Sequence, residues 1–529
     1  MKNFMLLILL IPLFGFNQAL IITEIADPNG SGSANKRFIE IFNNSNSSID
    51  LTDYKIKKWV GSSTSTGSNE STLQGTLEAY SFYIIASHAD TFKSTYGFAA
   101  NQITSAVISG NGDDSYALIY ASNGHVYDLY GTGNNTDGSN TGWEYEDGRA
   151  ERDGSSTTAS TVWLQADWNV YNDTGGGGST NSPQNAPNDY DPGHWTGSPA
   201  HDTWHGRTST SWSNNGNWSS GTAPVSSDKV HVRQSTNSPI ISDENSISDL
   251  TIYSSGTMTI DKDGALTANG EIINNGTLTI ESDSDESGSL IAKLASTPSI
   301  TYNNYVYSGE WKLIGLPVTG EVVDDIDDNL LANGSKSAIG YYDNANGSWA
   351  TFNTGSTSGT ELVNTRGYEI RAASSNGTVS FTGTMLNSDL TNVAITTETS
   401  PGSNWNLVGN PYPSFVRMTD DSGDTTNNFL KVNASAIDDT AEAVYGWDGT
   451  SYDIYDHDDD ASGRPDLIAP GTGFFIYAAS DTNVSFTEAM QVHSGGIGFH
   501  GSLANGSETR RSAKVTIRMN DEFLSKNLR

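Results

Sequence analysis

The stretch LTIYSSGTMTIDKDGALTANGEIINNGTLTI, residues 250–280, places short apolar triplets about six to eight residues apart. Turn signals such as DG at 263–264 and NG at 275–276 separate the triplets. Short strands punctuated in this way are typical of hairpins and of the corners of a parallel β-solenoid. We predict a β-solenoid over residues 204–300. A meander of hairpins is the alternative, because the period is not strict.

Three tryptophans precede this repeat region: Trp204, Trp212 and Trp218. They lie in a context rich in Ser, Asn and Gly, which by itself offers little apolar surface. We therefore expect the three indoles to cap a hydrophobic end of the repeat region.

Downstream of the solenoid the sequence repeats itself. WKLIGLP at 311–317 matches WNLVGNP at 405–411, and GYEIRAAS at 367–374 matches GFFIYAAS at 473–480. Matches in the same order are improbable by chance, so we predict two related β-sandwich units at 301–390 and 391–490. Residues 491–529, with a strand pattern at 513–519, are expected to open a further β module that is truncated.

Upstream, six candidate strands are separated by Gly, Asn and Asp, at residues 20–25, 37–42, 49–56, 80–86, 116–120 and 125–130. Their spacing predicts an immunoglobulin-like sandwich over residues 20–173. The Gly- and Ser-rich residues 174–203 are predicted to be a flexible linker. The whole chain is thus expected to be all-β.

Composition excludes several classes of protein. The 529 residues carry 27 Lys+Arg against 62 Asp+Glu, a formal net charge of -35, and no cysteine. Such a field repels a polyanion, so we expect no nucleic-acid partner. The absence of cysteine excludes disulfide scaffolds, thiolate zinc sites and cysteine nucleophiles.

The N-terminus predicts export. A short positive start, Met1-Lys2-Asn3, precedes the apolar run 4–16 and then Ala19, the pattern of a signal peptide over residues 1–19. The run is short for a membrane span, which takes about 20 residues. No later stretch is apolar enough to cross a membrane, so we expect a secreted or cell-surface protein without a transmembrane segment.

Two parts of the chain resemble known families. ITEI at 22–25, FIEIFN at 38–43 and IDLTDY at 49–54 resemble the opening of a bacterial lamin-tail domain, with further likeness extending to about residue 190. That resemblance implies an immunoglobulin-like sandwich that accompanies extracellular hydrolases or surface domains, with no catalytic residues. Residues 405–414 and 470–476 resemble a domain of proteins exported by the type IX secretion route.

One acidic run is a candidate metal site. Asp456, Asp458 and Asp460 alternate within 456–463 and could present oxygens to a Ca²⁺ ion. An EF-hand loop is excluded, because Ala461 stands where it needs Gly and Leu467 where it needs Glu. A solvated acidic turn is the alternative, as for the matching run at 324–328. No cofactor is expected to be required.

Other polar and aromatic clusters have simpler interpretations. The histidines at 194, 201 and 205, with Asp191 and Asp202, match no metal-site spacing and are interpreted as linker residues. Glu24 and Glu40 are expected to pair across adjacent strands, with a structural role such as bonding loop amides. Five tryptophans, taken as exposed, could stack on sugar rings: Trp143, Trp163, Trp168, Trp349 and Trp447.

No catalytic motif occurs in the sequence. The leading hypothesis is therefore a non-enzymatic exported protein for surface display, adhesion or interaction. One alternative is the accessory portion of an extracellular hydrolase, a nuclease, phosphatase or glycosidase whose catalytic module is absent. Another is a protein that binds cell-surface or extracellular polysaccharide through the duplicated region.

Overall fold

The computed structural model describes residues 19–493, except 46, 62–68, 78–79, 199–201, 234, 255, 295, 307–309, 327–328, 335, 354–358, 374–376, 448, 450 and 457–466. The predicted signal peptide over residues 1–19 lies, apart from Ala19, outside the described residues. The chain divides into two compact units, residues 1–200 and 201–529. No helix of the described residues has both the length and the apolar character needed to cross a bilayer.

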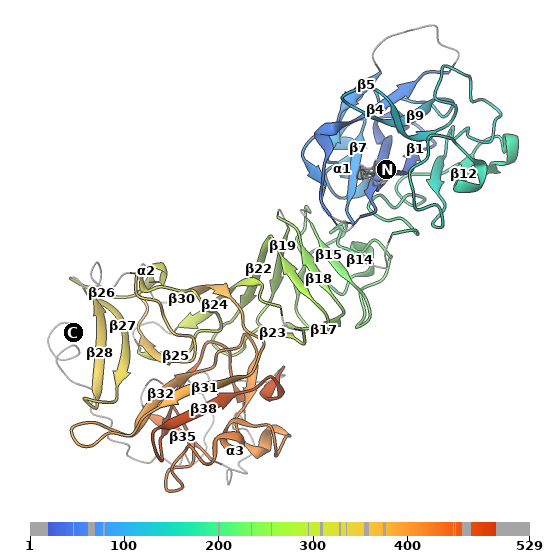
Figure 1. The fold of residues 1–529 in the computed structure, drawn as a ribbon. Coiled ribbons are helices and arrows are strands. Elements are labelled where there is room, and N and C mark those ends of the chain that lie inside the picture. Colours follow the sequence, from blue (N-terminus) through green and yellow to red (C-terminus); the bar gives the residue numbers. More distant parts are fainter. Residues whose placement is uncertain are drawn as a thin grey trace, which may run out of the picture. The chain divides into compact units, whose positions relative to one another are not determined.

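The first unit is a β-sandwich (Figure 1). One sheet has the order β13-β12-β11-β1-β2-β7-β8: Thr180–Asn181, Trp168–Asn172, Arg149–Arg152, Leu20–Ala26, Phe38–Asn43, Phe82–Ala86 and Gln102–Ile103. The facing sheet has the order β10-β9-β4-β5: Val126–Tyr130, Ser115–Tyr120, Tyr54–Trp59 and Glu70–Thr72. A side pair joins β3 (Ile49–Asp50) to β6 (Thr76–Leu77).

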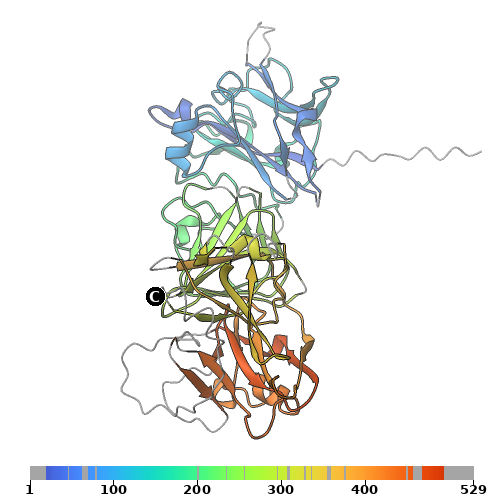
Figure 2. The ribbon, with the colours of Figure 1, turned by 90° about the vertical axis from the view of Figure 1, so that its left-hand side faces the viewer.

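Strands β1 and β2 lie in the middle of their sheet, and every residue of both is buried. Their inner side chains meet the facing sheet in the sandwich core. Phe38 on the other face contacts Phe92 and Tyr96 of helix α1 (Ala89–Tyr96) in edge-to-face ring contacts. Figure 2 shows α1 as a coil beside these strands. Burial on both faces explains why residues 38–42 alternate without a polar side.

The prediction of a flexible linker at 174–203 is wrong over most of its length. Strand β13 pairs with β12 in the first sheet. Tyr190 and Trp195 are 3% and 1% exposed in the first unit. Glycines at 175–178 indicated flexibility, but the aromatic residues that follow them supply apolar surface worth about 2 kcal/mol or more each when buried.

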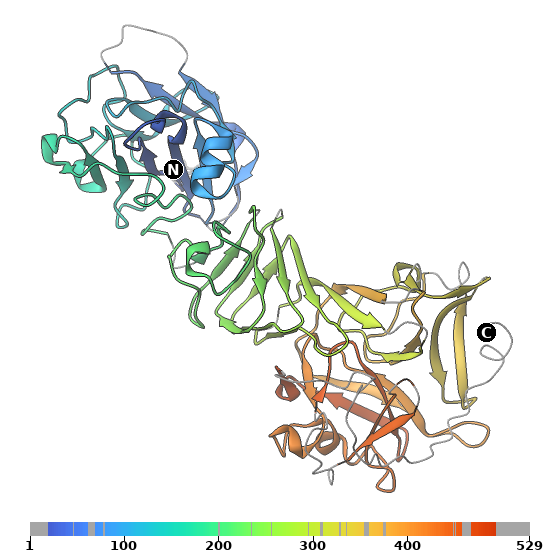
Figure 3. The same cartoon turned by 180° about the vertical axis from the view of Figure 1, so that it is seen from behind.

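The second unit begins with the predicted β-solenoid, whose strands stack in Figures 1 and 3. One side holds β14 (Asp202–Thr203), β15 (Val230–Val232), β18 (Leu250–Ile252) and β21 (Ile272–Asn274). The second holds β16 (Ile240–Ile241), β19 (Thr257–Ile260), β22 (Thr277–Glu281) and β24 (Ser299–Val306), and the third β17 (Glu244–Ile247), β20 (Ala265–Ala268) and β23 (Ser289–Ala292). All these pairs are parallel, so the hairpin meander is excluded.

Three strands make one coil, which explains the loose period of the triplets. Alternate residues such as Met258 and Ile260 point into the core, while Thr257 and Thr259 face outward. The corners need glycine: a β-carbon built on Gly276 would lie 2.3 Å from the carbonyl oxygen of Gly256 in the preceding coil. The NG and DG signals therefore mark close approaches of backbone between coils.

The three tryptophans cap the solenoid core, as predicted. Trp204, Trp212 and Trp218 are 0–2% exposed beside the first coil. Trp218 stacks edge-to-face on both other rings, and its indole N–H donates to the carbonyl of Trp212 at 2.7 Å. The indoles thus cover apolar side chains that would otherwise end the stack exposed.

The repeated sequences form two sheets of the same strand order. In the first, β25-β29-β27-β28 are Lys312–Ile314, Tyr368–Ile370, Lys336–Asp343 and Ser348–Asn353, with β26 (Ala332–Asn333) beside β27. In the second, β32-β37-β34-β35 are Trp405–Gly409, Gly473–Tyr477, Val444–Trp447 and Tyr452–Tyr455. Side chains of both sheets, among them Tyr342 and Phe475, share one aromatic core, so the two copies pack face to face.

Each copy adds an antiparallel strand pair and a short helix. The first has β24 with β30 (Gly377–Thr384) and α2 (Val323–Ile326); the second has β31 (Leu390–Ile395) with β38 (Thr482–Phe486) and α3 (Phe429–Asn433). The second also has the sheet β36-β33-β39: Leu467–Ile468, Phe415–Arg417 and Gln491–Val492.

The predicted boundaries at 300/301 and 490/491 do not separate structures. Strand β24 pairs with solenoid strand β22 on one side and with β30 on the other, so one core continues across residue 300. Strand β39 pairs with β33 and belongs to the second copy. His493 bonds Thr267 and Ser289 of the solenoid at 2.8 Å each. Residues 494–529 lie outside the described residues.

Candidate functional site

Three glutamates form a row across the first unit. The register of β2, β1 and β11 sets Glu40 opposite Glu24, and Glu24 opposite Glu151. Directly opposed side chains on neighbouring strands have β-carbons about 4.5–5.5 Å apart, where like charges repel. Glu24 and Glu40 are 2% and 0% exposed, so water does not screen them.

One arginine and one further carboxylate complete the cluster. The Arg149 guanidinium lies 3.4 Å from Glu24, 3.3 Å from Glu151 and 3.0 Å from Asp191. Asp191 also bonds a ring nitrogen of His194 at 2.8 Å. Three carboxyl groups therefore share one arginine, and a single cation cannot compensate three negative charges.

The pKa values of the carboxyl groups in the cluster are shifted in opposite directions. Burial raises the pKa of Glu40 to about 8 and holds the pKa of Glu24 well above its usual range, with only partial compensation by Arg149 for Glu24. Burial likewise raises the pKa of Glu151. Burial opposes ionisation of Asp191, but its bond to His194 and the charge of Arg149 together keep its pKa below the ordinary value.

The cluster holds residues 185–198, the docked segment, against the sandwich. Glu40 accepts a hydrogen bond from the Thr23 hydroxyl at 2.7 Å and from the backbone N–H of Gly193 at 2.5 Å. The expected pairing of Glu24 with Glu40 is present, and Glu40 bonds a loop amide as anticipated. No local pattern in the sequence indicates Glu151, and Asp191 lies in the stretch that the sequence predicts to be a linker.

Arg152 and Asp128 form a buried ion pair close to the docked segment. Arg152 and Asp128 are 1% and 0% exposed, and their guanidinium and carboxylate atoms are 2.6 Å apart. Arg152 also donates to the carbonyl of Ile22 at 2.7 Å and lies over the Trp168 ring, 4.6 Å from its centroid. The indole N–H of Trp195 donates to the Arg152 carbonyl at 2.7 Å. This pair links β1, β10 and β11 to the docked segment.

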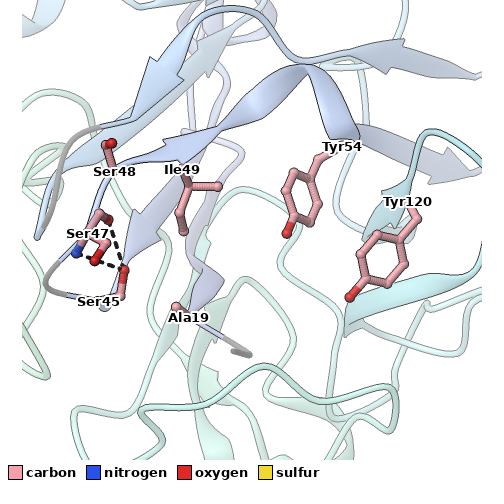
Figure 4. A pocket seen from close by; sticks show the side chains of 7 residues that line it. All are labelled: Ala19, Ser45, Ser47, Ser48, Ile49, Tyr54 and Tyr120. Carbon is pink, nitrogen blue, oxygen red and sulfur yellow. Dashed lines mark hydrogen bonds between the residues drawn. The ribbon is translucent and has the colours of Figure 1, made fainter. Parts of the chain in front are cut away.

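The pocket drawn in Figure 4 lies elsewhere in the first unit. It has a volume of about 250 Å³ and is lined by Ala19, Ser45, Ser47, Ser48, Ile49, Tyr54 and Tyr120. Tyr54 and Tyr120 stand on neighbouring strands with ring centroids 5.6 Å apart. Its lining offers hydroxyl groups and aromatic rings but no carboxylate, imidazole or amine. The glutamate row does not open into it.

The predicted metal loop falls mostly outside the described residues. Asp458 and Asp460 lie in 457–466, so only Asp456, half-buried after β35, is described. In the matching run, Asp324 and Asp325 are exposed in helix α2. Among the described residues, no group of three or more His, Cys, Asp or Glu side chains is arranged to hold a metal ion.

The interpretation of 194, 201 and 205 as linker histidines is wrong for the two that are described. His194 belongs to the carboxylate cluster, and His205 is 3% exposed in the second unit. Asp202 accepts hydrogen bonds from Ser219 and Ser220 at 3.0 and 2.9 Å. His194 and Asp202 are thus hydrogen-bonded within ordered structure, in two different units.

Two of the five tryptophans taken as exposed are core residues. Trp143 and Trp168 are 4% and 6% exposed, because the sandwich core uses aromatic side chains to fill its width. Trp163, Trp349 and Trp447 are half-buried. Trp349 and Trp447 pack against the aromatic core shared by the two copies.

Two family models match the chain. Residues 17–134 match the Lamin Tail Domain, which supports the resemblance seen in the opening strands. The same sandwich continues beyond that match through β11, β12 and β13. No curated protein matches at a significant level. Residues 203–518, more than half of the chain, match a domain of unknown function, DUF8693, and the protein therefore belongs to the DUF8693 family.

Proposed function

We propose that this is a non-enzymatic, exported, multi-domain protein that serves display or adhesion at the cell surface. The observation that carries the proposal is that the glutamate row and its arginine bond other parts of the same chain. Glu24 and Glu40 are buried, and Glu40 and Arg149 bind the chain's own Gly193 and Asp191. Carboxyls engaged in this way position backbone and are not presented to a substrate.

Two further observations support it. A single apolar core runs from Trp204 through the solenoid into the first copy, which suits a stiff structural element. The apolar run at 4–16 and the absence of cysteine suit export without a disulfide framework. The likeness of residues 405–414 to type IX cargo favours that route.

The test has an export arm and an activity arm. In a bacterium that carries the gene, N-terminal sequencing should find the mature chain starting near Leu20, and antibodies should label intact cells. A chain retained in the cytoplasm with Met1 in place contradicts export.

The purified full chain should show no turnover of DNA, phosphate esters or polysaccharides, with or without Ca²⁺ and Zn²⁺. Metal-dependent turnover that a single substitution such as Glu40→Gln abolishes would contradict the non-enzymatic proposal. It would favour a hydrolase instead.

A further inference from the structure

The second side of the solenoid carries columns of hydroxyl groups. Thr259, Thr279, Thr301 and Thr382 stand directly opposite one another on β19, β22, β24 and β30. Two residues along the same strands, Thr257 faces Thr277 and Ser299 faces Thr384. All eight side chains are exposed or half-exposed, whereas Met258, Leu278 and Ile300, which lie between them on β19, β22 and β24, are buried.

The columns form a regular two-dimensional array. Neighbouring strands lie about 4.7–4.9 Å apart, and alternate residues of one strand about 6.6–6.8 Å apart. The Oγ1 atoms of Thr301 and Thr382 are 2.9 Å apart, so the hydroxyls of this pair are within hydrogen-bonding distance. The χ1 angle of threonine is restricted, so each threonine holds its hydroxyl and methyl groups in few orientations.

The array has a rigid backing. Met258, Ile260, Leu278, Ile280 and Ile300 lie beneath it at 0–2% exposure. Each of its inner strands is hydrogen-bonded on both sides. Substantial rearrangement would break this packing, so a ligand meets preorganised hydroxyls at little cost in conformational entropy.

Its chemistry selects the kind of ligand. The two columns contain no charged side chain, in a chain of net charge -35. They contain no aromatic ring either, so they lack the usual platform for stacking on sugars. Glu281 follows Thr279 on the same face of β22, but the columns themselves are neutral. Their hydroxyls and methyls at regular intervals match a solid whose own hydrogen-bonding groups repeat in two dimensions, as the oxygens of ice do.

We propose that this threonine face, the eight side chains on β19, β22, β24 and β30, binds ice. The hydroxyls hydrogen-bond ordered water at the crystal surface, and the methyl groups occupy the spaces between them. This goes beyond the proposed function and does not depend on export.

The test uses ice itself as the probe and the purified full chain. Solutions are frozen slowly on a cold surface, and the protein concentration in the ice is compared with that in the remaining liquid. The wild-type chain should be enriched in ice over a folded acidic control protein, and should slow ice recrystallisation. Thr279→Tyr, at the centre of the array, should lose both effects.

Thr251→Tyr is the matched control, because Thr251 faces outward from β18 on another side of the solenoid, and it should behave as the wild type. Thr277→Lys, at an exposed position, is the second variant should Thr279→Tyr alter the far-UV circular dichroism. Exclusion of the wild-type chain from ice overturns the proposal. So does full activity in both variants, or retention on crystalline cellulose or chitin without enrichment in ice.

Discussion

Gly315 and Gly409 pack backbone to backbone between the two copies. A β-carbon built on Gly315 would lie 2.8 Å from the Cα of Gly409, and one built on Gly409 would lie 2.6 Å from the Cα of Gly315. The two glycines hold the same place in the repeated sequence. Gly367 likewise approaches the carbonyl of Val408, as Gly473 approaches that of Ile314. Such reciprocity is the mark of a two-fold contact, here within one chain.

Substitution of either central glycine should therefore destabilise the second unit. Gly409→Ala forces the backbones of the two copies apart, with an expected loss of roughly 1–3 kcal/mol or more of unfolding free energy. Urea unfolding followed by tryptophan fluorescence measures it. Gly359→Ala is the control, since nothing lies within 4 Å of its built β-carbon. Equal stability of the two variants would contradict the contact.

Glu369 should make stability fall with rising pH. Burial between the copies raises its pKa to about 8 from an ordinary value of 4.5, so the folded state binds more protons than the unfolded state between these values. The free energy of unfolding therefore decreases from about pH 4.5 to pH 8. Glu369→Gln should remove a few kcal/mol of this decrease, at about 1.4 kcal/mol per pKa unit. Unfolding at pH 5 and pH 8.5 tests it, with the exposed Glu271→Gln expected to keep the wild-type difference.

The Arg152–Asp128 pair should be expensive to break. Arg152→Met leaves the Asp128 carboxylate buried without its cation, at a cost of about 3–5 kcal/mol. Lys55→Met breaks the more exposed Lys55–Glu70 pair and should cost about 1 kcal/mol or less. Urea unfolding of both variants gives the comparison. A loss below about 1 kcal/mol for Arg152→Met would show that the pair is not buried in solution.

The docked segment should resist proteolysis through Trp195. Trp195→Ala removes a side chain that is 1% exposed and bonded to the Arg152 carbonyl, with an expected loss of about 3–5 kcal/mol. Limited proteolysis should then cut within residues 185–198, which the wild-type chain protects. Val162→Ala, at a side chain 61% exposed, should leave the free energy of unfolding within about 0.5 kcal/mol of wild type. It should also leave the pattern of proteolytic cuts unchanged. Rapid cleavage of the wild-type chain in this segment would restore the linker interpretation.

Only part of the candidate site can be predicted from the sequence. ITEI and FIEIFN placed Glu24 and Glu40 on adjacent strands, since alternation and turn signals are local. Glu151 and Asp191 are more than 100 residues away, and no local pattern reports which distant strand adds beside β1. Asp191 also follows a glycine-rich run whose composition suggests flexibility.

The sequence by itself determined the all-β class, the coils of the solenoid and the duplication, because side-chain alternation, glycine corners and repeated motifs are encoded within short stretches. Tertiary structure alone decided that the two copies pack about Gly315 and Gly409. It also decided that β24 belongs both to the solenoid and to the first copy, and that the threonines of four strands align into one face. These features depend on register between segments far apart in the chain. Burial and hydrogen bonding of the whole fold set that register.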